Sequence, residues 1–159
     1  MRERPRSSRP RRLADWLNPT GEKKVHSLVD KVYHKKNLAL AWEKVKRNGG
    51  AGGVDGQGLA EFEENLDENL ARLHEELKQD TYRPLPVREH RIPKEGQPGK
   101  TRKLGIPTIY DRVCQQALVN RLDPIFETVF DDASFGYRRG RSTKDALCKI
   151  WRELERGNE

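Results

Sequence analysis

The sequence has few of the residues that define metal-binding or membrane proteins. Its 159 residues include only two cysteines, Cys114 and Cys148, no Cys-x-x-Cys pair and four scattered histidines. No metal-ligand cluster is therefore expected, and both thiols are predicted to be reduced and buried. No apolar run approaches the roughly 20 residues that span a membrane, and no apolar segment of the signal-peptide type begins the chain. We expect a soluble, cytoplasmic protein with no membrane partner.

Hydrophobic residues are also scarce, while charged residues are abundant and segregated. Hydrophobic residues make up 33% of the chain and charged residues 36%, with a formal net charge of +7. One modest core is all that such a composition can support. Basic and acidic blocks alternate: residues 49–80 are strongly acidic, whereas residues 1–48 and 81–107 are strongly basic. This segregation predicts one anion-facing side, for which nucleic acid is the first candidate partner.

The spacing of apolar residues predicts an α+β fold that is mainly helical and carries one basic β-hairpin. Residues 1–20, with six arginines in the first twelve positions, are predicted to be a disordered basic tail that either binds RNA backbone or stays solvated. Residues 21–159 are predicted to form the folded region. One helix is expected to begin at Val25 and a second to follow Asn37 as its N-cap. Residues 59–78 are expected to form one helix or a pair, with Asp55 as the cap. Two further helices are expected to begin at capping boxes, Thr108–Asp111 and Ser142–Asp145.

Each predicted helix carries an apolar stripe at three- and four-residue spacing, which we expect to be buried. Pro124 falls inside the fourth helix, so either that helix kinks or Asp123 caps a new one. The predicted stripes are Leu38, Ala41, Trp42 and Val45; Phe62, Leu66, Leu70, Leu73 and Leu77; Cys114, Leu118, Leu122, Ile125 and Val129; and Leu147, Ile150, Trp151 and Leu154.

Residues 87–106 have the pattern of a basic β-hairpin. The stretch 87–94 predicts one strand, the sequence EGQPGK at 95–100 a tight turn, and 101–106 the returning strand. Six cations are opposed by only Glu89 and Glu95. Like charges this close repel one another, so an anionic ligand would balance them. The alternative is a solvated surface hairpin whose charges keep an edge soluble.

Two glycine-containing segments are further candidates for ligand contact. The sequence NGGAGGVDGQG at 48–58 contains Gly52 and Gly53, and it has neither the GxGxxG spacing nor the lysine and hydroxyl of a P-loop. It is predicted to approach a ligand closely or to act as a flexible connector. The second segment, FGYRRGRST, places three arginines directly before a predicted helix N-terminus, where phosphate is attracted. These are Arg138, Arg139 and Arg141.

Three blocks of sequence resemble the fingers region of the reverse transcriptases that bacterial group II introns encode. They are WEKVKRNGGAGGVDG, then IPK followed by a turn and TRKLGIPTIYDR, then SFGYRRGRSTKDAL, in the order of that family and within residues 38–151. The resemblance implies a fingers subdomain truncated before the palm domain of an RNA-directed DNA polymerase. Its implied partners are group II intron RNA, a DNA primer or target and dNTPs, in the bacterial cytoplasm in association with the nucleoid or a ribonucleoprotein. The alternative is a non-catalytic maturase module that binds intron RNA and assists splicing.

The resemblance also implies roles for individual residues. Lys94, Arg102 and Arg88 would contact the phosphates of the incoming nucleotide. Gly52 and Gly53 would lie over the template, and Arg138, Arg139 and Arg141 would contact the template or primer backbone. The chain departs from the family at Lys103, where the family often has proline or another apolar residue, and at Arg139, where it usually has proline.

Catalytic aspartates are expected to be missing from this chain. Asp131 and Asp132 superficially resemble the metal-binding Asp-Asp turn of reverse transcriptases, but they precede the FGYRRGRST block instead of following it. We interpret them as a surface pair that ends a helix. The Mg²⁺ ligands of the full-length enzyme would then lie in the palm domain, and the fragment is expected to be inactive alone.

Overall fold

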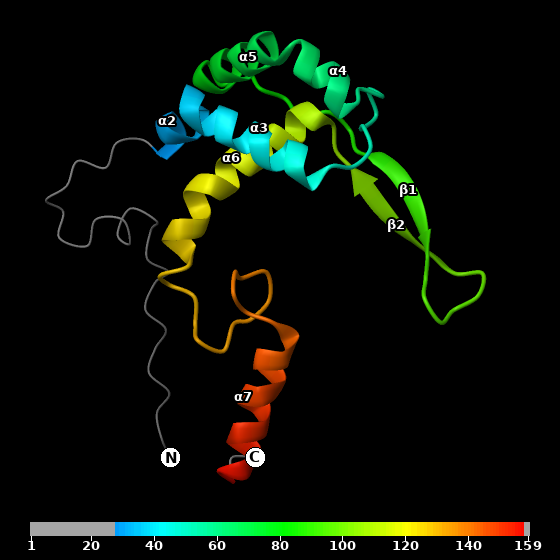
Figure 1. Cartoon of the computed structure of the whole chain (residues 1–159), viewed down its shortest axis with the longest axis vertical. Helices are drawn as coiled ribbons and strands as arrows, with labels where there is room; N and C mark the ends of the chain where they lie inside the picture. Colours follow the sequence, from blue (N-terminus) through cyan, green and yellow to red (C-terminus); the bar gives the residue numbers. More distant parts are fainter. Residues whose placement is uncertain (1–27, 158–159) are drawn as a thin grey trace, which may run out of the picture. The chain divides into compact units, whose positions relative to one another are not determined.

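The computed structural model describes residues 28–157 and divides the chain into two compact units, with the boundary in the sequence between Arg121 and Leu122. The described part combines six helices with one two-stranded antiparallel sheet, as the α+β prediction requires. The predicted tail over 1–20 and the helix start at Val25 lie outside the described residues. The elements are α2 (Leu28–Tyr33), α3 (Lys35–Asn48), α4 (Leu59–Glu64), α5 (Leu66–Lys78), β1 (Arg88–Pro93), β2 (Thr101–Ile106), α6 (Ile109–Phe126) and α7 (Thr143–Glu155) (Figure 1).

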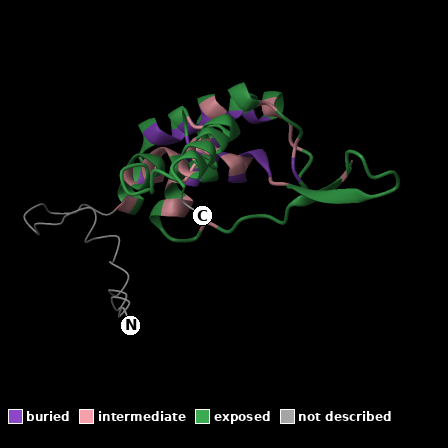
Figure 2. Cartoon of the chain, turned by 90° about the horizontal axis from the view of Figure 1, so that it is seen from below, coloured by how far each residue is buried: buried purple, intermediate pink, exposed green. Residues whose placement is uncertain are grey.

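The core of the first unit is built around α3. All four residues of its predicted stripe are buried, and the Trp42 ring stacks on Phe62 of α4 with centroids 4.9 Å apart. Leu73 of α5 and the first turns of α6 complete the cluster. Buried positions therefore line the helix faces that meet, while the hairpin is exposed along almost its whole length (Figure 2).

The start of α3 differs from the prediction, because Asn37 is not its cap. His34 is the N-cap and accepts a hydrogen bond from the Lys36 amide at 3.3 Å. Asn37 is buried within the helix, where its side-chain amide donates to the carbonyls of Val32 and Ala117 at 2.8 and 3.0 Å. A buried amide must be satisfied, and here it links α2, α3 and α6. The sequence shows only that asparagine suits a cap.

The acidic region forms a pair of helices, one of the two predicted arrangements. The chain breaks between α4 and α5 at Asn65, and Asn69 of α5 donates to the Phe62 carbonyl at 3.1 Å. The predicted Asp55 cap is wrong. Gly58 occupies the N-cap position of α4, and the Asp55 carboxylate instead accepts from the Gln57 amide at 3.3 Å.

Helix α6 begins as predicted but buries a different stripe. Thr108 accepts from the Asp111 amide at 3.1 Å, so the predicted cap is confirmed. The buried apolar positions are Ile109, Val113, Cys114 and Ala117, whereas the predicted Leu118 and Val129 are exposed. Helix α6 has apolar residues on more than one face, so spacing alone does not select the face that meets α3. The helix also continues past Pro124 to Phe126, which rules out a new helix capped by Asp123.

Helix α7 lies in the second unit and has the predicted start but none of the predicted burial. Ser142 and Asp145 form a reciprocal capping box. The four residues of the predicted stripe are nevertheless 56–66% exposed, and no residue of α7 is buried. Cys148 is therefore exposed, contrary to prediction, while Cys114 is buried. A stripe predicts an apolar face but not the element that covers it. None of the described helices combines the length and the apolar character needed to cross a membrane.

Candidate nucleotide and nucleic-acid interface

The hairpin has the strand boundaries and the turn that its sequence predicts. The strands pair antiparallel with Arg88 opposite Ile106 and Ile92 opposite Arg102. The Lys94 amide donates to the Lys100 carbonyl at 2.9 Å and closes the turn. Gly96 and Gly99 have positive φ of 70° and 79°, which glycine adopts at little cost. Because register is fixed, the face on which each side chain lies is fixed too.

One face of the hairpin carries the three residues predicted to contact nucleotide. Opposed residues in an antiparallel pair share a face, and alternate residues along a strand share a face. Arg102 opposes Ile92, so it lies on the face of Arg88. Lys94 continues the same alternation one step beyond β1. We call Arg88, Lys94 and Arg102 the cationic face; contact with a nucleotide remains a prediction.

The two cations on the opposite face of the hairpin share one internal carboxylate. The Glu89 carboxylate lies 3.2 Å from Arg91 Nε and 2.9 Å from Lys103 Nζ. Among residues 28–157, by contrast, no hydrogen bond or ion pair holds the side chains of the cationic face. All three are exposed. The positive charge available to an external anion is therefore concentrated on one face.

The base of the hairpin is fastened to α6 by the buried carboxylate of Asp111. It accepts hydrogen bonds from the Tyr82 hydroxyl at 2.5 Å, the Leu85 amide at 3.2 Å and the Thr108 hydroxyl at 2.7 Å. Burial, and then the hydrogen bond to Asp111, raise the pKa of Tyr82, so its hydroxyl remains a donor. The sequence predicted the Thr108 contact only; the contacts with Tyr82 and Leu85 span more than twenty residues and have no local signal.

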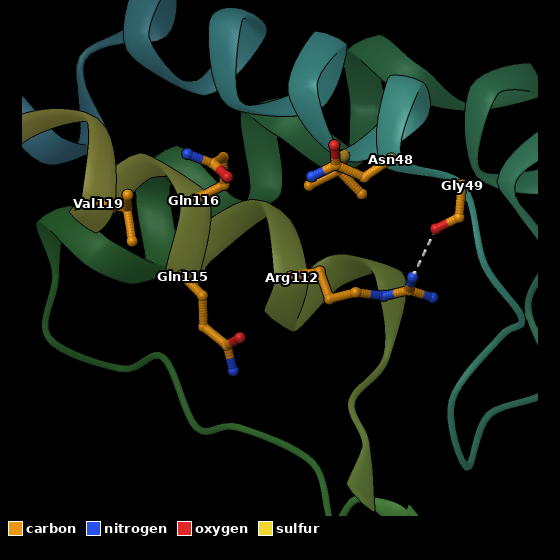
Figure 3. A pocket seen from close by; sticks show the side chains of 7 residues that line it. Asn48, Gly49, Arg112, Gln115, Gln116 and Val119 are labelled. Carbon is orange, nitrogen blue, oxygen red and sulfur yellow. Dashed lines mark hydrogen bonds between the residues drawn. The ribbon is translucent and has the colours of Figure 1, made fainter. Parts of the chain in front are cut away.

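The loop between α3 and α4, residues 49–58, which we call the glycine loop, is held by the neighbouring Arg112. Its guanidinium donates to the carbonyl of Gly49, as Figure 3 shows, and to the carbonyl of Ala51. Burial lowers the pKa of Arg112, and Asp55 opposes that shift. Gly49 and Gly50 both have positive φ, at 66° and 104°.

The two glycines predicted to lie over a template have internal roles in the structure. A Cβ on Gly53 would lie 2.6 Å from the backbone nitrogen of Thr108, and one on Gly52 would lie 2.3 Å from the Gln57 carbonyl oxygen. Both positions therefore require glycine for packing within the chain. Contact of Gly52 and Gly53 with nucleic acid remains a prediction.

A cavity of about 220 Å³ lies between the end of α3 and the first three turns of α6 (Figure 3). Its cation, Arg112, is engaged by the two loop carbonyls, and Arg112 Nε is covered and has no acceptor. No carboxylate or imidazole lines the cavity, so it offers no acid or base. Its lining is Val45, Asn48, Gly49, Arg112, Gln115, Gln116 and Val119.

The three arginines of the second unit are not equivalent. Arg138 is buried, and its guanidinium donates to the Glu127 carboxylate, with the shortest distance 2.7 Å, and to the carbonyls of Asp131 and Ser134. Arg138 thereby lowers the pKa of Glu127. This internal role was not predicted, and it leaves the Arg138 guanidinium little free capacity for phosphate.

The other two arginines of that segment are more accessible. Arg141 donates to the Asp132 carbonyl at 2.7 Å and lies 3.2 Å from its carboxylate. Arg139 is exposed and has no hydrogen bond or ion pair within the described residues. Arg139 is therefore the arginine most available for the predicted contact with a template or primer backbone, and Arg141 is the next.

The described residues do not fit a Mg²⁺ centre. No group of three or more His, Cys, Asp or Glu side chains in residues 28–157 is placed to hold a metal ion. Asp131 instead accepts from the Ala133 amide at 2.7 Å, and Asp132 pairs with Arg141. Residues 28–157 therefore provide no site for a catalytic metal ion.

The chain is similar in sequence to known proteins, while no protein-family profile matches it. Protein YkfC of Escherichia coli K12 is 34% identical over 150 residues, which are 93% of this chain and 39% of that protein. Group II intron-encoded protein LtrA of Lactococcus lactis subsp. cremoris is 42% identical over 88 residues, 55% of this chain and 14% of that protein. The chain thus spans well under half the length of these curated relatives. Over about half of its own length, the chain is homologous to a group II intron-encoded protein.

Proposed function

We propose that the chain is the fingers region of an RNA-directed DNA polymerase of the group II intron type, and that the cationic face binds the triphosphate of an incoming dNTP. The observation that carries this proposal is the charge asymmetry of the hairpin. Glu89 pairs with both cations of one face, whereas Arg88, Lys94 and Arg102 have no internal partner among the described residues. Homology to a group II intron-encoded protein supports the same function.

The chemistry of the cationic face suits a triphosphate. Transfer of a nucleotidyl group depends on positioning and on neutralising phosphate charge. Guanidinium groups such as those of Arg88 and Arg102 donate two parallel hydrogen bonds to phosphate oxygens, while the Lys94 ammonium acts as a mobile point charge. In this proposal the hairpin binds and orients the triphosphate, and the metal-binding carboxylates belong to a palm domain that is not among the described residues. We therefore expect no polymerase activity from this chain alone.

Template or primer backbone would bind at Arg139 and Arg141, with the glycine loop as a second contact. The accessible Arg139 lies three residues before Ser142, the N-cap of α7, where positive charge and the helix dipole both favour phosphate. The second candidate function is a maturase module in which the same cations hold structured intron RNA. Homology to LtrA, a group II intron-encoded protein, is compatible with both the polymerase and the maturase function.

The decisive experiment compares two double variants of the same hairpin. Lys94→Ala with Arg102→Ala removes two charges from the cationic face, and Arg91→Ala with Lys103→Ala removes the two cations that pair with Glu89 on the opposite face. Fluorescence anisotropy with a labelled dNTP should show affinity about tenfold or more weaker in the first, because charge-assisted hydrogen bonds to phosphate are lost. The second should change affinity by less than about threefold, because its cations are already paired.

The same variants distinguish the two functions when labelled single-stranded RNA replaces the dNTP. A selective loss of dNTP affinity by the Lys94 and Arg102 variant supports the polymerase assignment. An equal loss of RNA and dNTP affinity would show that the hairpin is a backbone clamp, as the maturase reading requires. Equal effects of the two double variants on dNTP binding would contradict the cationic face altogether.

A further inference from the structure

The hairpin is fixed to the helical body only through its base. Its residues are exposed apart from Ile92 and Ile106, which are half-buried. Figures 1 and 2 show it extending away from the helices of the first unit. A two-stranded sheet that buries so little surface is not held in one orientation by packing against the helices. Its direction therefore depends on the segments that enter and leave it.

Both of those segments are bonded to the same carboxylate. Leu85, three residues before β1, donates its amide to Asp111 Oδ2 at 3.2 Å, and Thr108, two residues after β2, donates its hydroxyl to the same oxygen at 2.7 Å. Tyr82 occupies Oδ1 at 2.5 Å. Asp111 is 2% exposed, and a buried carboxylate that loses some of its hydrogen bonds destabilises the fold. The three hydrogen bonds therefore favour one arrangement of the segments that donate them.

Arg112, the next residue of α6 after Asp111, fastens the glycine loop to the same helix. Arg112 bridges the carbonyls of Gly49 and Ala51. The loop also lies directly on the exit of the hairpin, since a Cβ on Gly53 would come within 2.6 Å of the Thr108 backbone. Thr108 thus contacts the loop through its backbone and Asp111 through its side chain.

We propose that Asp111 and Arg112 are positioning residues that hold the hairpin and the glycine loop in one fixed relation on the first turn of α6. The consequence for binding rests on the proposed function: the cationic face and the loop then present triphosphate and template contacts as one unit. If the hairpin samples other orientations, the apparent dissociation constant rises as the inverse of the competent fraction.

The hydrogen bond from the Leu85 amide to Asp111 can be removed by a substitution at Leu85, which leaves the Asp111 side chain unchanged. Leu85→Pro deletes the donor in a segment that already contains Pro84 and Pro86, while Leu85→Ala keeps it. The side chain itself is half exposed, so neither change removes core packing. Spin labels at Gln97→Cys in the turn and Ala71→Cys on α5, in a Cys148→Ser background, report the hairpin's orientation as an electron–electron distance distribution.

The expected result is a broader distance distribution for Leu85→Pro and for Asp111→Asn, and an unchanged one for Leu85→Ala. The affinity for a labelled dNTP should fall with the broadening, about tenfold if the competent fraction falls to about a tenth. A distribution for Leu85→Pro that matches wild type, in protein with wild-type circular dichroism, would overturn the hairpin half of the proposal.

The loop half is tested by Arg112→Lys, which keeps the charge but cannot bridge two carbonyls with a planar fork. Labels at Val54→Cys and Ala71→Cys should report a broader distribution in Arg112→Lys than in Gln115→Ala, a neighbour on α6 that holds no loop carbonyl. Equal distributions would overturn this half, because charge alone would then suffice.

The outcomes separate this inference from the proposed function. If the Lys94 and Arg102 variant leaves dNTP affinity unchanged, the proposed function fails, and the label distances still decide whether Asp111 and Arg112 position the two elements. If those distances stay narrow in every variant while the Lys94 and Arg102 variant loses affinity, the inference fails and the proposed function stands.

Discussion

At the residue scale, arginines that look alike in the sequence have different roles. Arg102 and Arg138 both lie in basic segments that resemble one family. Arg102 is exposed without a partner among the described residues, whereas Arg138 is buried against Glu127 and two carbonyls. The difference depends on which carboxylates the fold brings near each guanidinium. Charge patterns therefore locate candidate segments, and the tertiary contacts decide which member remains available to a ligand.

The Arg138–Glu127 pair predicts a pH dependence of the second unit. Because Arg138 lowers the pKa of Glu127 in the folded state, the unfolded state binds a proton more readily. The contribution to stability is then present above the unfolded pKa of a glutamate, about 4.3, and is lost as pH falls through the lower folded value. The protection factors of the amides in residues 127–141, which correct exchange rates for the intrinsic effect of pH, should therefore fall at acid pH in wild type.

Arg138→Ala should show fast exchange in this segment already at neutral pH. Arg139→Ala, one residue along and unpaired within the described residues, serves as the control and should keep the wild-type profile. Exchange in Arg138→Ala as slow as in wild type at pH 7 would contradict the internal role given to this arginine.

At the element scale, several signals that lie within a few residues predicted the structure correctly, although the Asn37 and Asp55 caps did not. The Thr108 cap of α6, the capping box of α7 and the hairpin all depend on neighbouring residues. The apolar stripes of α6 and α7 were not read correctly, because burial requires a second element. On α6 the contact with the rest of the core selected Val113 and Ala117; on α7 no residue is buried.

Since α7 buries none of its residues, its N-cap should carry much of its stability. Ser142→Ala removes the acceptor of the Asp145 amide and should destabilise the helix by about 1 kcal/mol. Amide exchange over residues 143–148 should accelerate accordingly. Ser134→Ala, in the same unit but not capping a helix, should leave that exchange unchanged; an equal acceleration would show that the box is not what holds the helix start.

At the scale of the whole molecule, the first unit has one small core and the second has very little. Apart from Arg138, every buried residue of the described part belongs to the first unit. Two leucines of α3, two positions apart, give a matched test, because Leu38 is completely buried and Leu40 is exposed. Leu38→Ala should lower the free energy of unfolding by about 2–5 kcal/mol, and Leu40→Ala by less than about 0.5 kcal/mol.

Urea unfolding followed by tryptophan fluorescence measures both variants, since Trp42 lies in the same core. Comparable losses for Leu38→Ala and Leu40→Ala would mean that the α3 stripe does not carry the stability of this unit.

The sequence by itself determined the capped starts of α6 and α7, the hairpin and the residues that share its cationic face, and the similarity of three segments to one family. Each of these depends on the order of residues over a short stretch. Only the tertiary structure decided that Asn37 joins three helices, that Asp111 holds both ends of the hairpin and that Arg138 is internally paired. These three polar side chains are buried, and a buried polar group takes its partners from whichever distant segments the fold brings to it.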